Sequence, residues 1–161
     1  VEDWHAHLTT LFPEFRLKRY IEVRSIDSQS PETVLAAPAI IKGLFYEDYC
    51  LLAAWDLVKR WSWGERLELQ DAVHRTALRA RIRGIAVQEL CRELLDIARV
   101  GLERQAVYDE NGQDESQYLV PIRTLVDAGK CPADALVSHW REGSARGIQD
   151  IIAATAYRAM S

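Results

Sequence analysis

The chain has 161 residues, of which 48% are hydrophobic and 27% are charged, and its formal net charge is −4. This composition is typical of a globular protein with one hydrophobic core, and the charge excludes a global electrostatic attraction to nucleic acid or to anionic membranes. No apolar stretch approaches the roughly 20 residues that a helix needs to cross a bilayer. The sequence therefore predicts neither a nucleic-acid partner nor a membrane partner.

The cysteines and the first residues bear on the compartment. Cys50, Cys91 and Cys131 are odd in number and widely spaced, and they form no CxxC pair. We interpret them as reduced thiols, which are typical of an intracellular protein. The opening VEDWHAH has no features of a secretory leader, so we expect a cytoplasmic protein.

The first predicted elements are a short helix or turn over residues 3–10, ended by Pro13, and then a strand over about residues 16–26. Strand side chains alternate between two faces. One face would carry Arg16, Lys18, Tyr20, Glu22 and Arg24, and the other would carry Leu17, Ile21 and Val23. A single strand cannot satisfy its own backbone groups, so we expect it to pair with strands that this sequence does not reveal.

The rest of the chain has helical patterns. The predicted helices cover about residues 32–46, 48–61, 63–78, 86–104, 115–127, 132–141 and 146–159. The first is apolar on nearly all sides and would be kinked or split by Pro38, and the third opens with the capping box Ser62–Glu65. An arginine-rich link spans residues 75–83, and a loop spans 109–113. Trp55, Trp61, Trp63 and Trp140 are interpreted as fillers of the core or of grooves.

We therefore predict an α+β fold that is mostly helical, with one antiparallel-type N-terminal strand packed on about six helices. Residues 1–29 would form the region that carries the site, and residues 30–161 the helical region, both in one structural unit.

The charged face of the strand has two interpretations. A solvated edge strand also alternates charged and apolar residues. The density of charge favours a site, because Glu22 lies between cations and Asp27 closes the strand. Carboxylates bind hard divalent cations such as Mg²⁺, and the planar fork of arginine suits phosphate oxygens. Phosphoryl transfer needs both kinds of group.

The segment HLTTLFPEFRLKRYIEVRSID resembles the active-site region of glutamate–cysteine ligases, most closely the plant and proteobacterial type. The shorter YIEVRS-x-D resembles the wider carboxylate–amine ligase family. Further along, AAPAIIKGLFYED, AAWDLVKRW, ARVGLERQ and PADALVSHWREG match the family in order. The resemblance implies the C-terminal part of a larger glutamine-synthetase-like ligase fold, with the N-terminal part of the same enzyme as a missing partner.

The family resemblance implies a reaction. Such enzymes use ATP and Mg²⁺ to phosphorylate the γ-carboxylate of glutamate, and the amine of cysteine then attacks, which is the first step of glutathione synthesis. Glu22 would be a Mg²⁺ ligand, and Arg24 the catalytic residue that contacts the transferred phosphate. Arg16, Lys18, Tyr20 and Thr10 would lie in the substrate-binding neighbourhood. We expect the 161 residues alone to be inactive.

Two departures from the family leave alternatives open. After the strand, SQSPETVLAA replaces the plant segment that leads to a cysteine, so disulfide regulation is not implied. The stretch HRTALRARIRG is more basic than is usual in the family. One alternative is a carboxylate–amine ligase with another acceptor amine. The other is a helical interaction module that has lost the chemistry.

Overall fold

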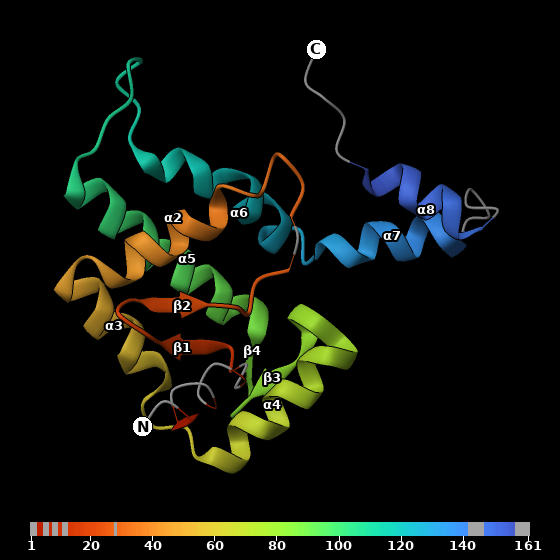
Figure 1. The fold of residues 1–161 in the computed structure, drawn as a ribbon, viewed down its shortest axis with the longest axis horizontal. Helices are drawn as coiled ribbons and strands as arrows, with labels where there is room; N and C mark the ends of the chain where they lie inside the picture. Colours follow the sequence, from red (N-terminus) through yellow and green to blue (C-terminus); the bar gives the residue numbers. More distant parts are fainter. Residues whose placement is uncertain are drawn as a thin grey trace.

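In the computed structural model, most of the chain is helical and two short β-hairpins lie among the helices (Figure 1). The structure describes residues 3–4, 7, 10, 13–27, 29–141 and 147–156, without the side chain of residue 154. The α-helices are α2 (Ala36–Phe45), α3 (Asp48–Val58), α4 (Trp63–Thr76), α5 (Val87–Gln105), α6 (Val120–Asp127), α7 (Pro132–Arg141) and α8 (Ile148–Thr155). The mostly helical α+β class predicted from the sequence is confirmed.

The predicted N-terminal strand is wrong as one continuous element. It is a hairpin of β1 (Phe15–Leu17) and β2 (Ile21–Val23), which pair antiparallel. The three residues from Lys18 to Tyr20 form the turn, which is closed by a 2.8 Å hydrogen bond from the Lys18 N–H to the Tyr20 carbonyl. The strand therefore pairs with the chain's own next segment, and a three-residue loop is a common hairpin connection.

Helix α2 starts later than the sequence predicted, and it continues unbroken through Pro38. Residues 31–35 form turns, and the regular helix begins at Ala36. Pro38 thus falls within the first turn, where its missing N–H has no helical partner to lose.

A second hairpin replaces part of the predicted arginine-rich link. The 3₁₀ turn η1 (Ala77–Arg79) leads into β3 (Arg81–Ile82), which pairs with β4 (Ile85–Ala86). Arg83 and Gly84, between the strands, have φ angles of 50° and 84°. Two positive φ angles in a two-residue loop are typical of the turn that matches strand twist, and Gly84 adopts this conformation without steric cost.

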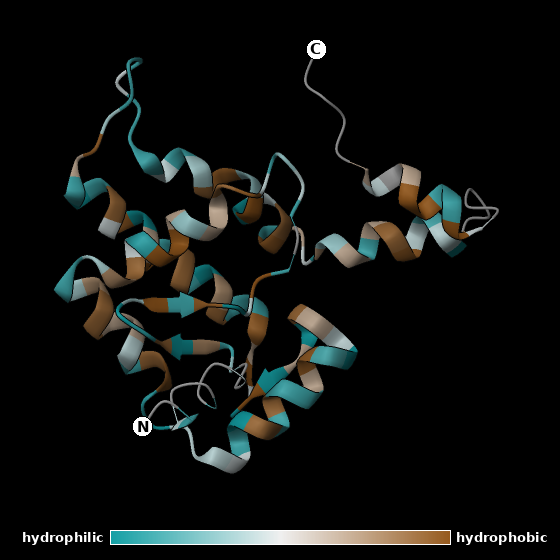
Figure 2. Ribbon diagram, viewed as in Figure 1, coloured by the Kyte–Doolittle hydropathy of each residue, from teal (hydrophilic) through white to brown (hydrophobic). Residues whose placement is uncertain are grey.

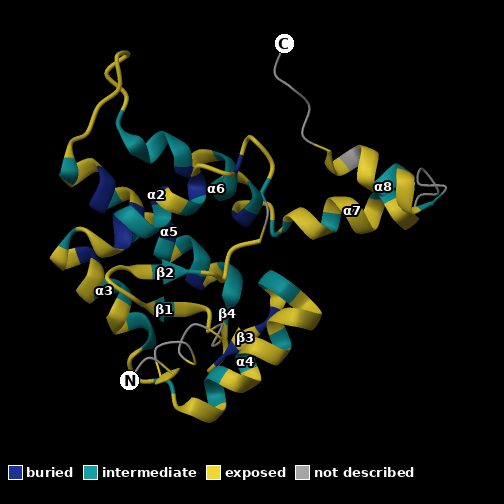
Figure 3. Cartoon of the chain, in the orientation of Figure 1, coloured by how far each residue is buried: buried dark blue, intermediate teal, exposed yellow. Residues whose placement is uncertain are grey.

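The core forms where α2 crosses α5, with α6 and the 3₁₀ helix η2 (Glu115–Leu119) packed beside them (Figure 3). Ala39 and Leu44 meet Leu95, Ala98, Leu102, Leu119 and Val126. At the crossing, a Cβ on Gly43 would collide with the Ala98 carbonyl, and one on Gly101 would collide with the Gly43 carbonyl. Glycine therefore permits backbone-to-backbone contact between the two helices.

Polar contacts fix the ends of the helices. Ser62 and Glu65 form the predicted capping box of α4. The predicted loop turns at Asn111 and Gly112, and the N–H groups of Asn111 and Gln113 donate to the Asp109 carboxylate. Arg123 of α6 contacts Asp96 of α5 at 2.6 Å.

Several large apolar side chains are exposed, contrary to the prediction for the tryptophans. Trp55, Trp63 and Trp140 are exposed, and Trp61 is half-buried. Helices α7 and α8 extend away from the other helices, and both carry apolar and polar residues (Figures 1 and 2). In the part of the chain that the structure describes, no helix has the length and apolar character to span a membrane.

Candidate functional site

The N-terminal hairpin places Arg16 directly across from Glu22. Directly paired residues of an antiparallel ladder lie on the same face. The Nε and Nη2 atoms of Arg16 both lie 2.7 Å from Oε2 of Glu22. The sequence put these two residues on one face by alternation along one strand, whereas the structure brings them together across two strands.

Two further cations reach the same carboxylate. Lys18 Nζ lies 3.5 Å from Oε2, and Arg24 Nη1 lies 3.3 Å from Oε1 of Glu22. The side chains of Lys18 and Arg24 are 40% and 37% exposed, whereas that of Arg16 is 13% exposed. Lys18 and Arg24 can therefore meet a ligand from solvent more readily than Arg16 can.

This environment stabilises the ionised form of Glu22. The hydrogen bond from Arg16 is the main cause that lowers the pKa of Glu22, partial burial opposes it, and the charges of Arg16, Lys18 and Arg24 lower it further. Among the contacts of the described residues, three cations surround one carboxylate and give this face an excess of positive charge, in a chain whose net charge is −4. Unit charges about 4 Å apart interact by about 1 kcal/mol in water and about 4 kcal/mol near a protein surface. The face therefore attracts an anion more strongly than a free cation.

The other two predicted residues are less closely joined to Glu22. The Tyr20 ring is exposed at the hairpin turn, and its centroid lies 5.9 Å from Lys18 Nζ. Thr10 is exposed and donates a 2.7 Å hydrogen bond to the His7 carbonyl. Tyr20 thus borders the charged face, and among the described contacts Thr10 has none with it.

A complete metal site is not formed by the residues that the structure describes, since they include no cluster of three or more His, Cys, Asp or Glu side chains. Glu22 can supply one carboxylate ligand. Mg²⁺ commonly uses one or two carboxylates together with substrate phosphates. The donor set fits Mg²⁺ that arrives with an anionic phosphate, and it does not fit the free ion.

The basic stretch before α5 has a structural role at Arg83. Its guanidinium contacts Glu65 at 2.6 and 2.9 Å and donates to the Arg60 carbonyl. Together with the Ser62 cap, this pairing lowers the pKa of Glu65 to about 2, with the Arg83 hydrogen bond as the largest cause. Arg83 thus joins the β3–β4 turn to the start of α4.

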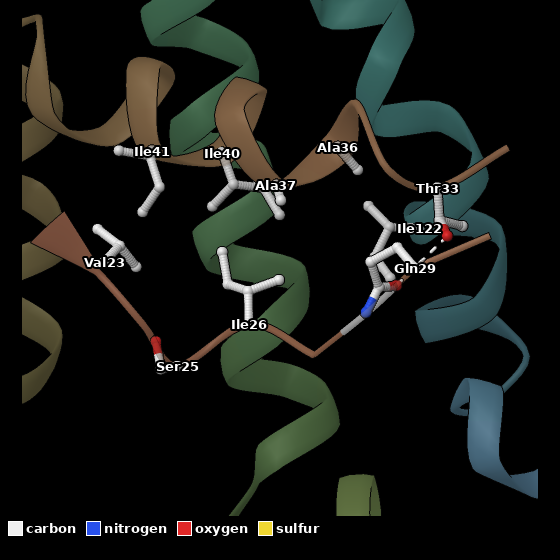
Figure 4. Close-up of a pocket in the computed structure, with 10 residues that line it drawn as sticks. All are labelled: Val23, Ser25, Ile26, Gln29, Thr33, Ala36, Ala37, Ile40, Ile41 and Ile122. Carbon is white, nitrogen blue, oxygen red and sulfur yellow. Dashed lines mark hydrogen bonds between the residues drawn. The ribbon is translucent and has the colours of Figure 1, made fainter. Parts of the chain in front are cut away.

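A cavity of about 280 Å³ lies beside the carboxyl end of β2, and the sequence gave no prediction of it (Figure 4). Its apolar wall includes Val23, Ile26 and Ile40, and its polar groups come from Ser25, Gln29 and Thr33. The hydroxyl of Thr33 donates to the Gln29 side chain at 3.3 Å. Polar residues before an apolar helix were the one sequence feature that pointed to this cavity. Its shape, however, depends on how Ser25, Gln29 and Thr33 lie against α2, which the sequence does not show.

Comparison with known proteins gives a consistent family. Residues 1–152 match the model of glutamate-cysteine ligase family 2. The chain belongs to this family. It is 37% identical over 135 residues to the chloroplastic glutamate–cysteine ligase of Arabidopsis thaliana, and 35% identical over 137 residues to that of Medicago truncatula. It is 32% identical over 151 residues to glutamate–cysteine ligase A of Oryza sativa subsp. indica.

These matches cover most of this chain but only a small part of the length of each relative. They include 84% of this chain and 25% of the Arabidopsis protein, and 94% of this chain and 30% of the rice protein. The chain therefore spans less than a third of the length of these relatives.

The same comparisons contradict the predicted cytoplasmic location, because the relatives are named as chloroplastic enzymes. The prediction rested on unpaired cysteines and on the first residues. Cys50, Cys91 and Cys131 are free thiols, and burial raises the pKa of Cys91. Free thiols indicate a reducing environment and cannot distinguish one reducing compartment from another.

Proposed function

We propose that this chain carries part of the active site of an ATP-dependent ligase that joins the γ-carboxylate of glutamate to the amine of cysteine, the first step of glutathione synthesis. The observation that carries the proposal is the charged face of the hairpin, where Glu22 stands among Arg16, Lys18 and Arg24. The family supports a ligase, and the excess of positive charge suits a triphosphate.

The side chains have different proposed tasks. Glu22 provides one oxygen ligand for Mg²⁺, which when bound would neutralise charge on the nucleotide phosphates. Arg24 donates hydrogen bonds to the transferred phosphoryl group. These bonds stabilise the negative charge on the equatorial oxygens of that group in the transition state. Lys18 adds positive charge on the same face of the hairpin, beside Tyr20.

The proposed reaction has two steps, a phosphoryl transfer and an acyl transfer. An oxygen of the γ-carboxylate of glutamate attacks the γ-phosphorus of ATP, and ADP leaves with the electrons of the broken P–O bond. The amine nitrogen then attacks the acyl carbon, loses a proton, and expels phosphate that retains the former carboxylate oxygen. Cysteine is the acceptor that the names of the relatives favour.

The rest of the site is proposed to come from polypeptide outside these 161 residues. The described part of the chain lacks a complete Mg²⁺ site, and the chain covers only 25–30% of its relatives. We propose residues 1–29 as the segment that carries the site and residues 30–161 as its helical support. The purified chain alone should show no turnover.

The test is ADP formation by the native polypeptide that carries this chain, with glutamate and a panel of amines. We expect ADP formation to require glutamate, Mg²⁺ and an amine, with cysteine the best acceptor. Glu22→Gln should abolish most of the Mg²⁺-dependent rate while the protein stays folded. An unchanged rate of ADP formation in Glu22→Gln would show that the hairpin takes no part in the reaction. A higher rate with another amine than with cysteine would change the assigned acceptor.

A further inference from the structure

The two oxygens of Glu22 are in different environments. Oε2 is 2.7 Å from each of two nitrogens of Arg16 and 3.5 Å from Lys18 Nζ. Oε1 is 3.3 Å from Arg24 Nη1. A carboxylate has about four acceptor positions, two on each oxygen. The two short contacts therefore saturate Oε2, while Oε1 keeps acceptor capacity.

We infer that Arg16 is a positioning residue, which holds Oε2 of Glu22 so that Oε1 is presented to the metal–phosphate ligand. This inference rests on the proposed function, and it changes the substrate-binding role that the sequence suggested for Arg16. The guanidinium of Arg16 acts through Glu22, and the side chains that meet the nucleotide are Glu22, Arg24 and Lys18.

Burial and register support this division of roles. The side chain of Arg16 is 13% exposed, about a third of the exposure of Lys18 or Arg24. Its backbone lies directly opposite Glu22 in the ladder, so the pair is fixed by the two strands that carry it. Two nitrogens of one guanidinium converge on Oε2 and hold that oxygen in place, which the single ammonium of a lysine does less well.

Residues that orient a metal ligand without touching the metal typically change metal affinity or activity by about 10- to 100-fold when they are mutated. We expect Arg16→Gln to weaken the Mg²⁺-dependent binding of a non-hydrolysable ATP analogue by a factor in this range. Titration calorimetry of the native polypeptide, with adenylyl imidodiphosphate at several Mg²⁺ concentrations, measures this. Arg19→Gln removes the same charge from the exposed hairpin turn and should change the affinity by less than about twofold.

A double-mutant cycle separates positioning from direct binding. If Arg16 acts through Glu22, the double variant should bind the ATP analogue less than about twofold more weakly than Glu22→Gln alone. If Arg16 itself contacts the nucleotide or glutamate, the two losses should multiply, and the inference would be overturned. Should Arg16→Gln fail to fold, Arg16→Lys keeps the charge without the paired donors, and we expect a loss of about 10-fold.

The failure of the proposed function would look different. In that case Glu22→Gln alone would leave the Mg²⁺-dependent binding unchanged. The positioning role would fail by itself if Glu22→Gln weakened binding while both variants at Arg16 had wild-type affinity.

Discussion

The N-terminal hairpin and the α2–α5 crossing are built in opposite ways. The hairpin is small, its turn and most of its apolar side chains are exposed, and charged groups dominate its contacts; Leu17 and Ile21 are 83% and 61% exposed. The crossing is buried, and its contacts are made by alanine, leucine and glycine. We infer that the hairpin serves chemistry and the crossing serves stability, so substitutions in the two regions should separate activity from stability.

The largest expected effect is on the crossing. In Gly43→Ala the new methyl group would overlap the Ala98 carbonyl, and since that neighbour is backbone the helices must move apart. We expect a loss of about 3 kcal/mol in the free energy of unfolding, measured by urea denaturation. Gly64→Ala is the matched control, because a Cβ there meets only open space, and it should stabilise α4 by about 0.5–1 kcal/mol. Equal stability of the two variants would show that the helices do not make this close contact.

The next effect is on activity without a change in stability. Arg24→Gln removes the proposed phosphate donor and should lower the rate of ADP formation by the native polypeptide about 100-fold. Its melting temperature should stay near that of the wild type, because the side chain of Arg24 is 37% exposed. If the melting temperature fell and the rate did not, Arg24 would be structural.

A smaller effect is expected at the start of α4. Ser62→Ala removes the side-chain acceptor for the Glu65 N–H, which is one half of the capping box. We expect a loss of about 1 kcal/mol in the free energy of unfolding, with no change in the activity of the native polypeptide. Wild-type stability would mean that the cap is replaced by solvent at no cost.

The smallest effect is a pH dependence at Glu65. Its pKa is lowered from 4.5 to about 2 in the folded chain, so the ionised carboxylate stabilises the fold at pH values above 4.5. This stabilisation should be lost as the pH falls from 4.5 towards 2, because the unfolded chain takes up the proton first. Glu65→Gln should therefore flatten the acid side of the curve of stability against pH. Glu68→Gln, at an exposed position on the same helix, is the control, and an equal change in both variants would contradict the role of the Arg83 pair.

The sequence predicted the helices best where caps and periodicity agreed. The capping box at Ser62 and the long apolar stripe of α5 gave bounds close to those observed. The hairpin turn was missed because Lys18, Arg19 and Tyr20 include none of the glycine, proline or asparagine that usually marks a turn. The strands β3 and β4 have two residues each, which is too short for an alternating pattern to appear.

The candidate site was predicted in part. Arg16, Glu22 and Arg24 do lie together as predicted, but Arg16 meets Glu22 across two paired strands and not along one. The unequal environments of the two Glu22 oxygens depend on cross-strand register, which a sequence without a visible turn cannot reveal. The cavity beside Val23 likewise depends on where residues 25–26 and 29–33 lie relative to α2.

The most direct measurement of the proposed phosphoryl transfer follows oxygen from glutamate to phosphate. The native polypeptide is supplied with ATP, Mg²⁺, cysteine and glutamate labelled with ¹⁸O in the γ-carboxylate, and the released phosphate is analysed by mass spectrometry. We expect one ¹⁸O atom in each phosphate formed, because the acyl phosphate is cleaved at its carbon–oxygen bond. Phosphate without ¹⁸O, formed while the labelled dipeptide accumulates, would contradict the proposed phosphorylation of glutamate.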